Sequence, residues 1–97
     1  MRHFHRTTLT PDVVLSTADH FFVALGLARQ SGDDRARSFS GSLGTMKLTV
    51  RMDGGHYALV EASTDQVGES RLDKNVKNFF VALHRTLDPR HKIEAGY

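Results

Sequence analysis

The stretch from Arg71 to Leu87 constrains the fold most, because its apolar residues recur at the spacing of an α-helix. At about 100° per residue they share one face. They are Leu72, Val76, Phe79, Phe80, Leu83 and Leu87. The opposite face carries the polar and basic residues Arg71, Lys74, Lys77, Asn78 and Arg85. The pattern predicts an amphipathic helix that buries one side and presents positive charge to water on the other.

A second helix is predicted from Pro11 to Gln30. Thr10-Pro11-Asp12 is typical of a helix start, with an N-cap, a proline in the first turn and an early acidic residue. We expect Ser31-Gly32 to end it. Its apolar stripe comprises Val14, Ala18, Phe21, Phe22, Leu25 and Ala28. Both helices contain FFVAL, which we interpret as the similar buried faces of two helices lying on one sheet; an ancient duplication is the alternative.

Strands are predicted at residues 2–8, 35–43, 45–53 and 56–63. The third has the clearest alternation, with Met46, Leu48, Val50 and Met52 on one face. Asp53-Gly54-Gly55 predicts a hairpin turn after it. The length of that loop decides which face of the last strand is buried. A three-residue loop buries Ala58, Val60 and Ala62, whereas a two-residue loop buries Tyr57 and Leu59.

The element order β-α-β-β-β-α predicts an α+β fold. We expect an antiparallel-rich sheet of three or four strands with two helices packed on one face and water on the other. Ser70-x-x-Asp73 resembles a weakened capping box for the second helix. A length of 97 residues indicates a single domain, residues 1–97, in which residues 89–97 are too polar to pack and form a loose tail.

Composition narrows the setting in which this chain works. It has no cysteine, which excludes disulfides and thiolate metal sites and fits a reducing cytoplasm. No apolar run is long enough to span a bilayer, so we expect a cytoplasmic protein with no membrane partner. The net charge of +2 permits a nucleic acid partner without requiring one.

Catalytic and metal-binding patterns are weak, and we expect neither an enzyme nor a cofactor. His3-x-His5 places two imidazoles on one face of a strand, but two ligands do not make a metal site, and exposed terminal histidines are the simpler interpretation. No nucleophile elbow surrounds the serines of residues 38–42, and no lysine follows Gly44 to make a phosphate loop.

Basic residues supply the main candidates for binding. Such spaced charges bind a phosphate backbone without sequence-specific geometry. The candidate nucleic-acid-binding residues are Arg71, Lys74, Lys77 and Arg85 on the second helix and Lys47 and Arg51 on the central strand. The two groups are expected on opposite sides of the protein, one on the helix layer and one on the open sheet face.

The segment MDGGHYALVEASTD, with its glycine pair and closing Asp65, resembles a strand hairpin of the ribosome hibernation-promoting factors, also described as ribosome-associated inhibitors. Thr10-Pro11 resembles the start of that family's first helix, and the outward Lys74 and Lys77 resemble its basic second helix. The resemblance implies a fold similar to the double-stranded RNA-binding domain. It also implies binding to small-subunit ribosomal RNA, which would block messenger and transfer RNA.

The leading hypothesis is therefore a non-enzymatic RNA- or ribosome-binding module that inhibits translation by occupying the small subunit. The alternative is a protein–protein module, either a homodimer or a small accessory subunit, that docks through the open sheet face. A third hypothesis is a small ligand-binder, which would need a large apolar pocket between the sheet and the second helix.

Overall fold

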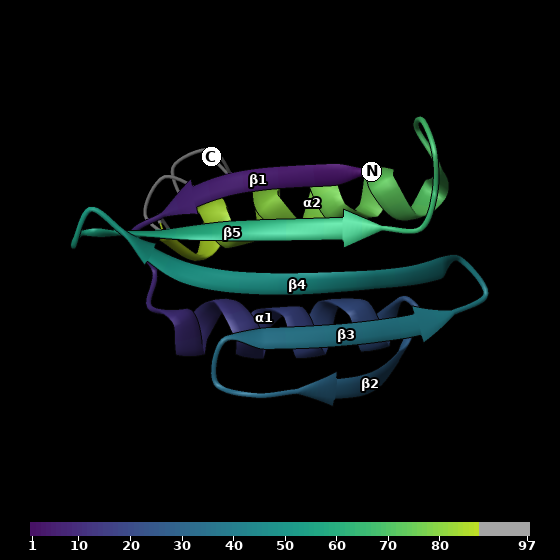
Figure 1. Cartoon of the computed structure of the whole chain (residues 1–97), viewed down its shortest axis with the longest axis horizontal. Helices are drawn as coiled ribbons and strands as arrows, with labels where there is room; N and C mark the ends of the chain where they lie inside the picture. Colours follow the sequence, from purple (N-terminus) through teal and green to yellow (C-terminus); the bar gives the residue numbers. More distant parts are fainter. Residues whose placement is uncertain (88–97) are drawn as a thin grey trace, which may run out of the picture.

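An antiparallel sheet of five strands forms one layer of the protein, and two helices form the other (Figure 1). The computed structural model describes residues 1–87. The strands are β1 (Arg2–Thr7), β2 (Ala28–Gly32), β3 (Ala36–Gly41), β4 (Gly44–Asp53) and β5 (Tyr57–Thr64), in the sheet order β1-β5-β4-β3-β2. The helices are α1 (Pro11–Ala24) and α2 (Arg71–Leu87). The predicted α+β class with both helices on one face is confirmed, whereas the predicted tail, residues 89–97, lies outside the described residues.

The first helix is shorter than predicted, and the residues expected to extend it form a strand. The helix ends at Ala24 with Leu25 as its C-cap, and Gly26 follows with a φ of 93°. The Gly26 N–H donates to the carbonyl of Val23 and the Leu27 N–H to that of Phe22, the paired bonds of a Schellman motif. The prediction that Ser31-Gly32 ends this helix is therefore wrong. The chain instead turns into β2, so the sheet has one strand more than the expected maximum.

The ambiguous face of the last strand is settled by the hairpin register. Asp53 pairs with Tyr57, which leaves a three-residue loop from Gly54 to His56. Both glycines have positive φ, as a tight hairpin requires. The alanine face of β5 is therefore buried beneath the helices, and Tyr57 lies on the open face of the sheet.

The core fills the space between the sheet and the helices. Rings of Phe22, Phe39 and Phe79 lie at its centre, with centroids 5.1 Å apart for Phe22 and Phe79 and 5.3 Å for Phe22 and Phe39. The predicted inward residues of β4, Met46, Leu48 and Val50, are buried, but Met52 near the strand end is 49% exposed. On α2 the predicted stripe is buried at Leu72, Val76, Phe79 and Leu83. Large aromatic side chains thus occupy the space in which the ligand-binder hypothesis needed a pocket.

The two helices cover different strands. Helix α2 lies beneath β1 and β5, and α1 lies beneath β2, β3 and β4 (Figure 1). The outer side of each helix and the open face of the sheet therefore face water on opposite sides of the molecule. Within residues 1–87 no helix has the length and apolar character needed to cross a bilayer.

Candidate nucleic-acid interface

The outer side of α2 holds the predicted basic residues in one arc. Arg71, Lys74, Lys77 and Arg85 are all exposed. At 1.5 Å per residue, the span from Arg71 to Arg85 is roughly 21 Å along the helix axis. The acidic residue of this helix, Asp73, points inward and is buried, so the outer arc has no carboxylate of its own.

One carboxylate reaches this arc from the loop before the helix. Glu69 Oε1 accepts a hydrogen bond of 2.8 Å from Lys77 Nζ. The pKa of Glu69 is lowered, first by that hydrogen bond and then by the charges of Lys77 and Lys74. Both partners of the pair are more than half exposed, so water and dissolved salt screen their attraction and the pair contributes little to stability. An incoming phosphate can therefore displace Glu69 from Lys77 at little cost.

A buried polar cluster fixes the start of α2 and with it the direction of the basic arc. Asp73 is 1% exposed and accepts hydrogen bonds from Ser70 Oγ at 2.6 Å, His3 Nε2 at 2.7 Å and Thr64 Oγ1 at 2.9 Å. The Asp73 N–H donates in return to Ser70 Oγ, which confirms the predicted capping contact. Burial by itself raises the pKa of Asp73, but these hydrogen bonds outweigh it and the pKa is lowered overall. The helix start is thereby joined to β1 and to the end of β5.

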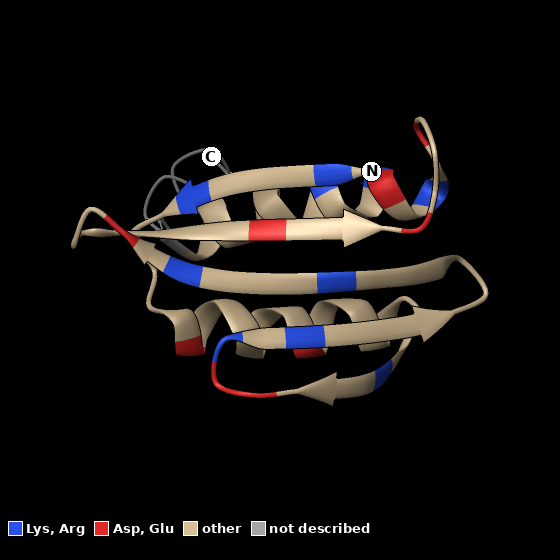
Figure 2. Cartoon of the chain, viewed as in Figure 1, with Lys and Arg blue, Asp and Glu red and all other residues tan. Residues whose placement is uncertain are grey.

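The other candidate residues, Lys47 and Arg51, lie on the open face of the sheet. They alternate along β4 with the buried residues Met46, Leu48 and Val50, so they point to the opposite face. Figure 2 shows further positive positions on β1 of the same sheet, with the helices behind it. These are Arg2 and Arg6, which reach the carboxylates of Glu61 at 2.7 Å and Asp53 at 2.9 Å. Lys47 and Arg51 form no ion pair with any residue in the range 1–87. The structure thus has two separate basic surfaces rather than one that combines all of the candidates.

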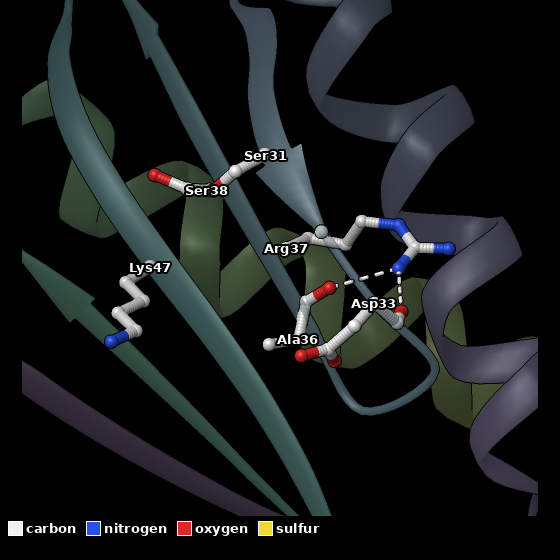
Figure 3. A pocket seen from close by; sticks show the side chains of 7 residues that line it. Ser31, Asp33, Ala36, Arg37, Ser38 and Lys47 are labelled. Carbon is white, nitrogen blue, oxygen red and sulfur yellow. Dashed lines mark hydrogen bonds between the residues drawn. The ribbon is translucent and has the colours of Figure 1, made fainter.

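Arginines at the β2–β3 end serve the fold rather than a surface. Arg37 Nε donates to Asp19 of α1 at 3.0 Å, and its Nη1 donates to the backbone carbonyls of Asp33 and Ala36. Arg29 also lies 3.5 Å from Asp19. Figure 3 shows Arg37 turned towards the helix and away from Lys47, Ser38 and Ser31. All four residues line one hollow. This arrangement leaves Lys47 as the cation that lines the hollow without an ion pair in the described part of the chain.

The histidines of β1 are not exposed, contrary to the simpler of the two interpretations. His3 bonds to Asp73, and His5 stacks on Phe80 of α2 with ring centroids 4.9 Å apart. Burial, and then the nearby His84, lowers the pKa of His5. No group of three or more metal-ligating side chains occurs among residues 1–87, and the contacts of both histidines explain their positions without a metal.

Two exposed aromatic rings lie on the open face of the sheet. The exposure of Tyr57 was one of the two alternatives for its strand, whereas Phe4 was not among the predicted site residues. Phe4 is 55% exposed and Tyr57 is 45% exposed. The guanidinium of Arg2 lies over the Phe4 ring at 5.5 Å, and that of Arg6 lies 6.0 Å from the centroid of Tyr57. The signal was present in the sequence, since Arg2, Phe4 and Arg6 alternate with the inward histidines of the same strand.

No protein-family model matches this chain, and no curated protein sequence is significantly similar to it. The two basic surfaces are therefore the features from which we infer a function.

Proposed function

We propose that this protein is a non-enzymatic RNA-binding module that contacts the phosphate backbone through the outer side of α2. The observation that carries the proposal is the arc of Arg71, Lys74, Lys77 and Arg85, in which every charged residue of the exposed side is a cation. Point charges spaced along a rigid helix match a backbone of regularly spaced phosphates and need no base contact.

The ribosome is the target that we propose for this surface, on the strength of the resemblance to ribosome hibernation factors. Binding to the small subunit would place the module where messenger and transfer RNA also bind. In a cell-free translation reaction, added protein should then lower the yield, and messenger RNA added in excess should restore part of it. Unchanged yield at a protein concentration that saturates ribosomes would refute the inhibitory role and leave binding intact.

Binding itself is tested by co-sedimentation with ribosomes and by fluorescence anisotropy with a labelled RNA duplex. If the four cations each neutralise a phosphate, duplex affinity should fall roughly 100-fold between about 50 and 200 mM salt. The variant Lys74→Glu/Arg85→Glu should release the protein and flatten the salt dependence by about two phosphates. The charge-matched control compares Lys74→Glu alone with Arg35→Glu, because Arg35 is exposed in the β2–β3 turn and lies away from both basic surfaces. Equal loss of duplex binding in Lys74→Glu and Arg35→Glu, or no binding at low salt, would rule out the α2 surface.

A protein–protein module remains the second candidate, and the exposed rings of Phe4 and Tyr57 favour it. A homodimer through the open sheet face predicts that the mass measured by light scattering rises with protein concentration. The variant Phe4→Ser/Tyr57→Ser should abolish that rise. A monomer mass at all concentrations would exclude the homodimer.

A further inference from the structure

The open sheet face is organised in rows that run across the strands, and one row holds only cations and hydroxyls. The strand pairing aligns Arg2 with Ser63, Ser63 with Lys47, Lys47 with Ser38 and Ser38 with Ser31. The row crosses all five strands, a width of roughly 19 Å at ~4.8 Å between neighbouring strands. Each of its side chains is able to donate a hydrogen bond to an anionic oxygen. It is therefore a track suited to a phosphate backbone.

A hollow lies at one end of this row. Its volume is about 300 Å³, and Ser31, Ser38 and Lys47 line it together with the β2–β3 turn (Figure 3). Water in the liquid occupies about 30 Å³ per molecule, so the hollow has room for a phosphate group and part of its hydration. Arg37 contributes to the wall, but its guanidinium is held by Asp19. Lys47 is thus the cation available to an anion there. Asp33 of the turn also lines the hollow, and its carboxylate accepts a hydrogen bond from the backbone N–H of Arg35.

Two exposed aromatic rings lie on this face, both on the same side of the row. Phe4 takes the next outward position of β1 after Arg2, whereas Tyr57 begins β5, six residues before Ser63 and roughly 20 Å from the row. Phe4 pairs with Glu61, and Tyr57 lies four residues before Glu61 on the same strand. At ~3.4 Å per residue this separates the two ring positions by roughly 14 Å along the strand direction. Successive bases in a helix are only about 3.4 Å apart. The two rings therefore suit two separate, unstacked bases of a single strand, which is how sheet surfaces with exposed aromatics take RNA.

The charges of this face also favour a polyanion. Its carboxylates, Glu61 and Asp53, are already held by Arg2 and Arg6. Lys47 and Arg51 remain without an acidic partner among residues 1–87. A homodimer through this face would have to bury Lys47 and Arg51, which is costly unless carboxylates of the second copy pair with them.

We propose that the open face of the sheet is a second RNA-binding surface, which takes a single strand and is separate from the α2 surface. Phosphates bind at the row that contains Lys47, and the strand continues from there along β1 and β5, where bases stack on Phe4 and Tyr57. The hydroxyls of Ser63, Ser38 and Ser31 both donate and accept hydrogen bonds, as the ribose 2′-hydroxyl does, and this matches RNA rather than DNA. The sheet surface and the α2 surface share no residue, so an experiment can refute RNA binding at one surface and leave binding at the other intact.

The test uses labelled single-stranded RNA of mixed sequence, single-stranded DNA of the same sequence and an RNA duplex, each titrated by fluorescence anisotropy. The variant Phe4→Leu/Tyr57→Leu keeps apolar side chains but removes the rings, and it should weaken single-stranded RNA binding by roughly 10-fold or more. Lys47→Gln should reduce the salt slope by about 0.7, the value for one phosphate of a single strand. Neither change should affect duplex binding. The side chains of Phe4, Tyr57 and Lys47 are all exposed, so we expect the variants to fold, and thermal denaturation checks this.

The variant Lys74→Glu/Arg85→Glu separates the two surfaces, since it should lose duplex binding. Removing the rings of Phe4 and Tyr57 in that variant should still weaken single-stranded RNA binding by the same factor as in the original chain. If the ring and Lys47 variants bind single-stranded RNA as tightly as the original chain, the sheet surface is refuted whatever α2 does. Equal affinity for DNA would overturn the assignment to RNA. A concentration-dependent mass that ring removal abolishes would assign the face to a second copy instead.

Discussion

Replacing Asp73 tests whether the buried polar cluster holds α2 in place. Its carboxylate accepts hydrogen bonds from His3, Thr64 and Ser70 at 2.6–2.9 Å, and the side chain is almost fully buried. Asp73→Ala removes the acceptor and leaves those three donors without a partner. It creates little new apolar burial in return, because the alanine side chain is small.

The size of the effect follows from the donors that are left behind. A buried donor without a partner costs about 1–3 kcal/mol, and loss of one partner of a buried ion pair costs about 3–5 kcal/mol. His3 retains 11% exposure of its side chain, so water can compensate part of its loss. We therefore expect Asp73→Ala to lower the free energy of unfolding by about 3–4 kcal/mol. Ser70→Ala removes only a capping contact and should cost about 1 kcal/mol.

Urea denaturation followed by circular dichroism measures both values, with the m-value as a check that unfolding stays two-state. The pKa of Asp73 is lowered in the folded protein, so its contribution is present above the unfolded value of about 3.9 and disappears as the pH falls through the folded value. The difference in stability between the original chain and Asp73→Asn should therefore narrow below about pH 4. A loss of less than about 1 kcal/mol for Asp73→Ala would show that the cluster does not anchor the helix.

Other substitutions probe the core, the turns and pH dependence. Phe79→Ala should cost about 3–5 kcal/mol in urea denaturation, since the ring is fully buried against Phe22; a loss near 1 kcal/mol would mean that the core collapses around it. Gly44→Ala should cost about 1–3 kcal/mol, because φ is 129° there and a Cβ would lie 2.7 Å from Asp65 Oδ1; unchanged stability would contradict that geometry. The pKa of His5 is lowered in the folded protein. The contribution of neutral His5 to stability is therefore full above its pKa in the unfolded chain, about 6.5, and is lost as the pH falls through its pKa in the folded protein. His5→Phe keeps the stacking on Phe80 and should remove this loss of stability at low pH. If the free energy of unfolding of His5→Phe and of the original chain changes in parallel from pH 7 to 5, the prediction is refuted.

The elements with a clear period were predictable, and α2 is the best example. Its predicted bounds, Arg71 to Leu87, agree with the structure because the apolar spacing is regular and Ser70 caps its start. The α1–β2 boundary was not predictable from the stripe alone. Leu25 and Ala28 continue the helical period, yet Gly26 allows a left-handed turn that only the paired bonds to Val23 and Phe22 make favourable.

The candidate site was predictable in its charges but not in its neighbours. The sequence places Lys74 and Arg85 on the outer side of α2, and the structure agrees. Periodicity could not show that Arg37 is held by Asp19, since the two residues come from a strand and a helix that meet only in the fold. It also could not place Tyr57 on the open face, because that depends on one residue of loop length before it.

The pairing of β1 with β5 has a consequence for how the chain folds. The hydrogen bond from the Met1 ammonium to the Thr64 carbonyl joins residues 63 apart in sequence, whereas β2 to β5 are successive hairpins. Closing a loop of that length costs about 2–3 kcal/mol more entropy than closing a three-residue hairpin. The β2–β5 meander is therefore expected to form early, and β1 to dock late. Because His3 of that strand also completes the contacts of Asp73, the last step of assembly is the one that locks α2 and its basic arc in place.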